Sequence, residues 1–393
     1  MKQLLANATP SSKFEGLRRI TSGGRLIPEI DGFRFLAILV VLIHHIHIQV
    51  ALAHGVSWPS WLIVPDGGRG VFLFFTISGF ILGLPFARRA LLEAAPIAPR
   101  QFSYRAYLVR RVTRLEPPYV LTLLLRFILI LAVFHSDIHD LTQHFFASLF
   151  YVHNLVFGTM SPVSPPTWSL EVEVQFYLLA PLFARVFLIR SAVRRRVLLV
   201  SVTFCFAFIT QTYCRENERV LLSLAGNLQY FTAGLLLCDF FVTRPFAKIP
   251  TYAWDCLGIG ALIPLLWNDA RWTMILLPFG SLVVYLAGLH GDWVRRFFAA
   301  PAISVAGGMC YSIYLTHGTV LTLVAVALAR APIAALPAAL QVVGVVGISL
   351  TVAFLVGAAF FVLIERPCMD PTWPQKVLAS LRRQFRMLPN SLH

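Results

Sequence analysis

Long apolar runs with few charges are the feature that most constrains this chain. Several runs of about 20 residues are long enough to cross the ~30 Å hydrocarbon core of a bilayer as α-helices. Hydrophobic residues make up 58% of the 393 residues and charged residues only 13%, too little charge to cover a soluble domain. We therefore predict an all-α, polytopic transmembrane helix bundle. Its ten expected spans are 33–53, 68–86, 117–135, 168–189, 196–213, 219–242, 251–267, 272–289, 303–330 and 336–364.

A further apolar stretch, 143–157, is short and contains histidines. Lys and Arg collect in cytoplasmic loops, and the segment 88–114 holds seven arginines and one acidic residue. If 143–157 crossed the membrane, the arginine cluster within 190–196 would lie outside the cytoplasm. We therefore predict that 143–157 is a re-entrant or interfacial helix on the outer side, with both termini cytoplasmic.

The same reasoning predicts the domain organisation. We expect a cytoplasmic tail over 1–30, a transmembrane domain over 31–367 and a second cytoplasmic tail over 368–393. Basic cytoplasmic loops account for the net charge of +15, so we expect membrane lipids and no nucleic acid among the partners. The six cysteines form no CxxC spacing, so we expect neither a metal site nor a structural disulfide.

Ionisable residues at membrane depth are costly and usually functional. In the first span, Arg34 and His45 are eleven residues apart, which places them on one helix face about 16 Å apart along the axis. Asp31 precedes them at the start of the apolar run. His45 is suited to proton transfer, or it is a histidine that only hydrogen-bonds between helices. Arg34 alone is also consistent with a side chain that extends to the interface.

Two more spans carry polar side chains at helical spacing. Glu173 and Tyr177 are neighbours one turn apart, and Trp168 at the start of that span suits a membrane interface. Later in the chain, Cys310, Tyr314 and His317 share a face and either line a cavity or bind neighbouring helices. Within 70–80, we interpret the pair Ser78–Gly79 as a close helix contact.

Six motifs occur in order along the chain. They are Asp31–Arg34 with His45, Gly70–Phe80, Arg110–Tyr119, Trp168–Pro181, Tyr311–His317 and Glu365–Pro367. In this order and on these spans they resemble the acyltransferase family 3 of membrane proteins, from about Ile30 to Pro367. Members of that family move acyl groups, often acetyl, from cytoplasmic acyl-CoA to hydroxyls of carbohydrates or other small molecules.

The resemblance implies an O-acyltransferase of the bacterial inner (plasma) membrane. Its donor substrate would be acetyl-CoA or another acyl-CoA, its acceptor a carbohydrate such as a surface polysaccharide, and no cofactor would be permanently bound. Some family members carry a fused extracytoplasmic domain. Because this chain ends shortly after its last expected span, we expect a stand-alone enzyme.

The resemblance also implies roles for individual residues. His45 would be the general base, Arg34 would hold the CoA pyrophosphate or the thioester arm, and Glu173 would orient His45 or the acceptor. A basic group on the CoA side either binds the CoA phosphates, because guanidinium forks suit them, or only supplies ordinary positive-inside charge or binds lipid headgroups. That group is Arg110, Arg111 and Arg114, and the residues expected to line the substrate site are Asp31, Trp168, Tyr177, Tyr314 and His317.

Two other classes of protein fit the same intramembrane charges. One is a proton-coupled transporter of a small polar or acylated solute. The other is a sensor or assembly scaffold in the cell envelope. Transporters often contain internal repeats or paired broken helices, and the sequence shows neither, so we favour the enzyme.

Overall fold

The computed structural model describes residues 16–20, 26–51, 55–56, 58, 64–92, 103–134, 137–267, 270–330, 336–370 and 372–376. All regular elements in these ranges are helices, which confirms the all-helical prediction for the described residues. In chain order they are α1 (Pro28–Ile46), η2 (His47–Ala51), α2 (Gly67–Leu92), α3 (Tyr104–Phe134), α4 (Ile138–Leu149), α5 (His153–Phe157), η4 (Pro165–Thr167), α6 (Trp168–Phe183), η5 (Ala184–Leu188), α7 (Ala192–Tyr213), α8 (Glu218–Leu221), α9 (Leu224–Thr243), α10 (Thr251–Trp267), α11 (Arg271–His290), α12 (Trp293–Ala299), α13 (Pro301–Gly308), α14 (Cys310–Leu328), α15 (Ala338–Phe360), η7 (Phe361–Glu365) and α16 (Arg366–Cys368).

Seven of the described helical segments are long and apolar enough to cross a membrane. They are Pro28–Ala51, Gly67–Leu92, Tyr104–Val133, Glu218–Thr243, Arg271–His290, Cys310–Leu328 and Ala338–Cys368. Each coincides with an expected span. The expected spans 168–189, 196–213 and 251–267 are not among the seven, so the total of ten stays a prediction.

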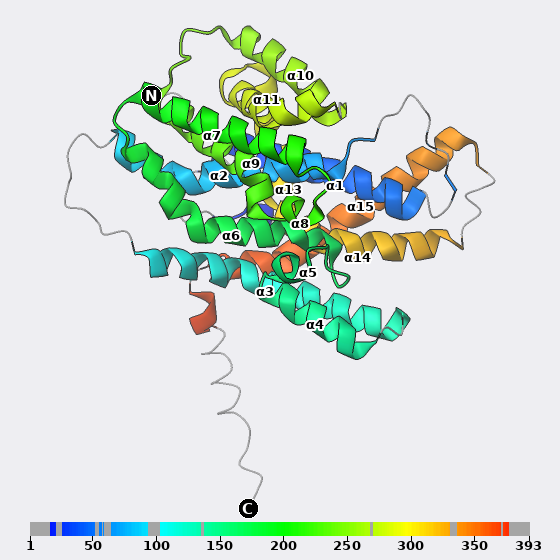
Figure 1. Ribbon diagram of the computed structural model, residues 1–393. Coiled ribbons are helices and arrows are strands. Elements are labelled where there is room, and N and C mark those ends of the chain that lie inside the picture. Colours follow the sequence, from blue (N-terminus) through cyan, green and yellow to red (C-terminus); the bar gives the residue numbers. More distant parts are fainter. Residues whose placement is uncertain are drawn as a thin grey trace, which may run out of the picture.

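The helical bundle has α1, α2 and α9 near its centre, with α10 and α11 at one edge and α3 and α4 at the opposite edge (Figure 1). The central contact between α2 and α9 is very close. A Cβ on Gly79 would lie 2.2 Å from the carbonyl oxygen of Phe231, and one on Gly234 would lie 2.3 Å from that of Thr76. Glycine is therefore required at this crossing, as small residues are at many membrane helix contacts. The predicted packing role is confirmed for Gly79.

Two segments differ in detail from the expected helices. The span expected over 303–330 is divided at Met309 into α13 and α14, directly after the glycine pair 307–308, whose residues have low helix propensity. The stretch 143–157 is also divided, into α4 and α5. Neither α4 with 12 residues nor α5 with five is long enough to cross a bilayer by itself, in agreement with a segment that does not cross.

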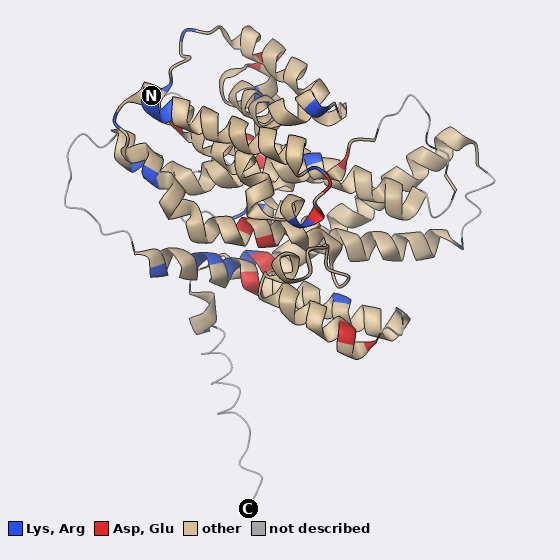
Figure 2. Cartoon of the chain, in the orientation of Figure 1, with Lys and Arg blue, Asp and Glu red and all other residues tan. Residues whose placement is uncertain are grey.

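Basic residues gather toward one end of the bundle, at the end of α2 and the starts of α3 and α7 (Figure 2). In one of these groups Arg195 is buried and Arg196 is partly exposed, and both form ion pairs with Asp239 on α9. We call this end of the bundle the arginine-rich end.

Candidate functional site

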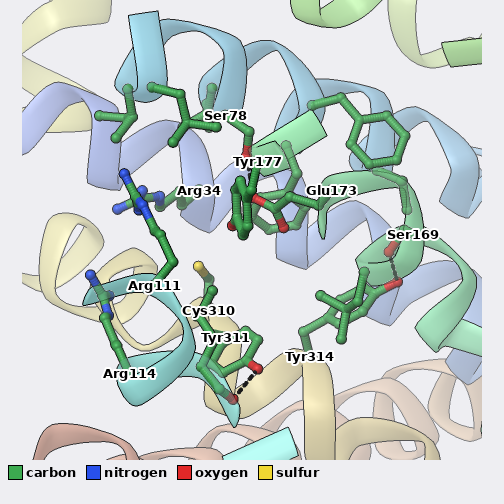
Figure 3. A pocket seen from close by; sticks show the side chains of 18 of the residues that line it. Arg34, Ser78, Arg111, Arg114, Ser169, Glu173, Tyr177, Cys310, Tyr311 and Tyr314 are labelled. Carbon is green, nitrogen blue, oxygen red and sulfur yellow. Dashed lines mark hydrogen bonds between the residues drawn. The ribbon is translucent and has the colours of Figure 1, made fainter. Parts of the chain in front are cut away.

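A pocket of about 110 Å³ lies between α1, α2, α3, α6, α14 and η7 (Figure 3). Its polar lining consists of Arg34, Ser78, Arg111, Arg114, Ser169, Glu173, Tyr177, Cys310, Tyr311, Tyr314 and Glu365. Six of these were expected at the site from the sequence: Arg34, Arg111, Arg114, Glu173, Tyr177 and Tyr314. The fold thus brings together side chains from helices that are far apart along the chain.

Arg34 is held in position by a buried ion pair. Its Nη1 donates to Asp31 Oδ1 at 2.6 Å, and the second oxygen of Asp31 accepts from Arg19 Nε at 2.9 Å. Asp31 is 1% exposed and lies behind the pocket, outside the residues that line it. A carboxylate with two guanidinium partners fixes Arg34 while leaving its remaining N–H groups available to the pocket.

Arg111 and Arg114 lie with Arg34 on one flank of the pocket, one turn apart on α3 (Figure 3). The guanidinium of Arg111 lies over the ring of Tyr177, 5.5 Å from its centroid. The guanidinium of Arg114 lies 3.8 Å from Glu365. Arg110, also expected from the sequence, is exposed and does not line the pocket.

Glu173 lies across the pocket from the arginines and accepts a hydrogen bond from the hydroxyl of Ser78 (Figure 3). Beyond it, the hydroxyl groups of Ser169 and Tyr314 lie 2.8 Å apart, and Tyr314 also donates to the carbonyl oxygen of Pro166 at 2.6 Å. The pocket therefore has a cationic flank and an opposite flank made of a carboxylate and hydroxyl groups.

His317 is in contact with the pocket residue Tyr314, and His45 lies beyond His317; neither histidine lines the pocket. Their rings are edge to face, with centroids 4.8 Å apart, and the ring of His317 is 5.4 Å from that of Tyr314. A path of rings therefore leads from the pocket, at Tyr314, through His317 to His45.

The tautomers of both histidines follow from their partners. His45 Nδ1 lies 2.9 Å from the carbonyl oxygen of Val41, and His317 Nδ1 lies 2.5 Å from that of Tyr314. A carbonyl only accepts, so each Nδ1 carries a proton, and in the neutral form of each ring Nε2 carries the lone pair. His317 Nε2 is buried and has no hydrogen-bond partner among the described residues.

Trp168 was expected to line the substrate site and lies outside the pocket. Its half-buried ring is 6.0 Å from that of Phe75, and its carbonyl oxygen accepts from the side chain of Asn154. It therefore packs the start of α6 against α2 and α5.

Sequence reasoning missed several pocket residues. Glu365 was part of a motif but received no role, and its Oε2 accepts from the backbone N–H and the hydroxyl of Ser312 at 3.1 and 2.5 Å. Its Oε1 is buried and has no hydrogen-bond partner in the described part of the chain. Ser78 was interpreted as a packing residue only. A carboxylate inside an apolar run was the signal available for Glu365.

Glu171, the other carboxylate near the start of α6, has a structural role. Glu171 is 1% exposed, and its two oxygens accept from the backbone N–H groups of His153 and Asn154, each at 2.8 Å. It therefore satisfies the N-terminus of α5 and fixes α5 against α6. No group of three or more potential metal ligands occurs among the residues described.

Comparison with known proteins agrees with these features. The O-acetyltransferase OatA of Staphylococcus aureus, from strains NCTC 8325 / PS 47 and COL, is 24% identical to this chain over 331 residues. A protein of strain COL, provisionally named as an O-acetyltransferase, is 23% identical over 332 residues. Each match covers 76% of this chain and 51% of the relative, so the chain spans about half the length of these curated relatives. No solved structure matches it.

A family model for an acyltransferase domain matches residues 27–358, which include all the pocket residues except Glu365. The match covers most of the chain and confirms the resemblance inferred from the six motifs. The chain therefore belongs to the acyltransferase family 3 of membrane proteins.

Proposed function

We propose that this protein is a membrane O-acyltransferase that moves an acyl group, acetyl in the simplest case, from acyl-CoA to a hydroxyl of a carbohydrate such as a surface polysaccharide. The observation that carries the proposal is the pocket itself. Arg34, Arg111 and Arg114 lie on one flank and Glu173 on the other, inside a transmembrane bundle of the acyltransferase family.

The cationic flank suits the donor. Planar guanidinium groups bind phosphate oxygens through paired hydrogen bonds, and CoA carries several phosphates. Arg111 and Arg114 are near the arginine-rich end, which we place in the cytoplasm with both termini because basic loops are retained there. On this assignment, acyl-CoA approaches from the cytoplasm and is a substrate, with no permanently bound cofactor.

The small volume of the pocket, about 110 Å³, suits only the reacting end of the donor. An acetyl thioester fits such a space, while the nucleotide would remain near the arginine-rich end. Arg34, fixed by Asp31, is placed to hold the thioester arm of the donor by hydrogen bonds from its remaining N–H groups.

His45 supplies the base in this mechanism. Its Nε2 accepts the proton of the acceptor hydroxyl, the oxygen attacks the thioester carbonyl, and the carbon–sulfur bond breaks. The proton then returns from His45 to the departing CoA thiolate. His317, in ring contact with His45, positions the base and connects it to Tyr314 at the pocket.

Glu173 and the hydroxyl groups near it suit the acceptor. Sugars are recognised by carboxylates, hydroxyls and aromatic faces, and Glu173, Ser78, Ser169 and Tyr314 supply all three kinds of group. The similarity to the S. aureus O-acetyltransferases supports an acetyl group transferred to oxygen. Membrane lipids would surround the bundle, and we place the protein in the bacterial inner membrane.

The proposal is tested with the purified protein in lipid nanodiscs, supplied with acetyl-CoA labelled in the acetyl group and a panel of oligosaccharides. We expect label in one oligosaccharide and one free CoA thiol for each acetyl group transferred. A proton-coupled transporter would instead move a solute into proteoliposomes when a pH gradient is applied and would release no CoA. That result would overturn the proposal.

A further inference from the structure

Arg126 lies on α3, within a predicted transmembrane helix, and has no part in the pocket described above. Its Nε donates to the carbonyl oxygen of Val163 at 2.8 Å, and its Nη1 lies 3.4 Å from the hydroxyl of Thr319. A Cβ on Gly318 would lie 2.7 Å from Nη1, so the guanidinium rests directly against the backbone of α14. These contacts fix the guanidinium and use two of its five N–H donors.

No carboxylate neutralises Arg126 in the part of the chain that the structure describes. Asp140 and Arg126 line one cavity, which is described below. The carboxylate of Asp140 lies 3.8 Å from the ring of His144, however, and its side chain is 73% exposed. A cation at membrane depth is costly without an anionic partner. The remaining N–H groups of Arg126 therefore call for an anionic partner that the described residues do not supply.

The cavities around Arg126 indicate what kind of molecule would carry that anionic group. Arg126, Asp140 and Thr322 help to line a cavity of about 440 Å³. Thr319 lines this cavity and also a second one of about 520 Å³, which lies between α3, α14 and α15. The second cavity is almost wholly apolar, and Leu323 and Val352 are among its lining residues. A polar site with one cation thus adjoins a hydrocarbon-lined groove.

The site is remote from the donor side of the molecule. Arg126 is 15 residues beyond Arg111 on the same helix, roughly 22 Å along its axis, and eight residues before Phe134, roughly 12 Å from the end of α3. It therefore lies in the half of the bundle away from the arginine-rich end, where lipid headgroups of the opposite leaflet approach.

We propose that the two cavities form one binding site for an anionic glycerophospholipid. Its phosphodiester pairs with Arg126, and one acyl chain occupies the groove between α3, α14 and α15. A free phosphate would leave the groove unused, and a neutral lipid would add no net charge to balance Arg126. Basic sites between transmembrane helices bind anionic headgroups in this way.

The test is native mass spectrometry of the full chain released from nanodiscs that contain equal amounts of phosphatidylglycerol and phosphatidylcholine, without acyl-CoA. We expect phosphatidylglycerol to be retained in preference, and Arg126→Gln to lower its retention about fivefold. Arg105→Gln is the matched control, because Arg105 is exposed on the same helix and lies outside both cavities. We expect it to retain phosphatidylglycerol as the wild type does.

A second variant tests the groove without removing charge. Leu323→Trp adds bulk at an exposed position of the groove and should displace the acyl chain while Arg126 remains. Equal retention of the two lipids by the wild type would overturn the proposal. So would unchanged phosphatidylglycerol retention in Arg126→Gln and Leu323→Trp. Displacement of bound phosphatidylglycerol by inorganic phosphate would also overturn it, because the groove would then add nothing to binding. Since no acyl transfer is measured, these results are independent of the proposed function.

Discussion

The rings of His45 on α1 and His317 on α14 lie edge to face with centroids 4.8 Å apart. Each ring has its Nδ1 hydrogen-bonded to a carbonyl oxygen of its own helix, so in the neutral ring Nε2 is the atom that can accept a proton. The two helices therefore hold a pair of imidazoles in contact, of which His317 contacts the pocket residue Tyr314.

His317→Gln removes the ring that contacts His45 and preserves a polar side chain. We expect kcat to fall by up to about 100-fold, because a displaced His45 is poorly placed to accept the proton of the acceptor hydroxyl, while KM for acyl-CoA stays unchanged. A steady-state kinetic series at several pH values measures this, and it should show an altered pH profile. A rise in KM with unchanged kcat would instead place His317 in donor binding.

Asp31→Asn removes the charge that fixes both Arg19 and Arg34. Losing one partner of a buried ion pair costs about 3–5 kcal/mol, so we expect a clear loss of thermal stability together with weaker CoA binding. Asp292→Asn is the control, since Asp292 pairs with the mostly exposed Arg296. The control should change the free energy of unfolding by no more than about 1 kcal/mol. If both variants lost the same stability, the buried ion pairs of Asp31 would contribute no more than the exposed pair of Asp292, which would contradict this prediction.

Arg111 and Arg110 are adjacent in the sequence but differ in their location relative to the pocket. Arg111 lines the pocket, while Arg110 is exposed outside it. Arg111→Gln should weaken binding of labelled acyl-CoA about tenfold or more, in line with the loss of a charge-assisted hydrogen bond. Arg110→Gln should have a much smaller effect. Equal losses would mean that the donor phosphates bind across the exposed face of α3.

Gly79→Ala tests the crossing of α2 and α9. The added Cβ would lie 2.2 Å from a backbone oxygen, so the helices must separate. We expect the free energy of unfolding to fall by at least about 1–3 kcal/mol, which would be measured as a lower unfolding temperature in detergent. Gly260→Ala is the matched control, because a Cβ there meets nothing within 4 Å. A Gly79→Ala protein as stable as the control would contradict the close contact.

Much of the fold could be predicted from apolar length and charge. Those signals are local, so they located the seven long helices and the short segment 143–157, but not its division into α4 and α5. The break between α13 and α14 was missed, because an apolar composition continues across Met309 and only the preceding glycines indicate it.

The candidate site could be predicted only in part, because helical spacing also describes one helix at a time. Helical spacing placed Arg34 and His45 on one face, but their separation of about 16 Å along α1 is too great for one small pocket to include both. Glu173 and Tyr177 were recognisable as polar groups in an apolar run. The pairing of Ser78 with Glu173 joins residues 95 positions apart, and no single helix pattern shows such a contact.

The most direct test of the mechanism compares acyl transfer by the wild type and His45→Ala in nanodiscs, with labelled acetyl-CoA and an accepted oligosaccharide. His45 lies outside the pocket that we assign to the donor, so the variant should bind CoA as tightly as the wild type. Its rate of transfer should fall by about 10²–10⁴-fold, as expected for loss of a general base. Transfer at the wild-type rate by a correctly inserted His45→Ala protein would contradict the mechanism.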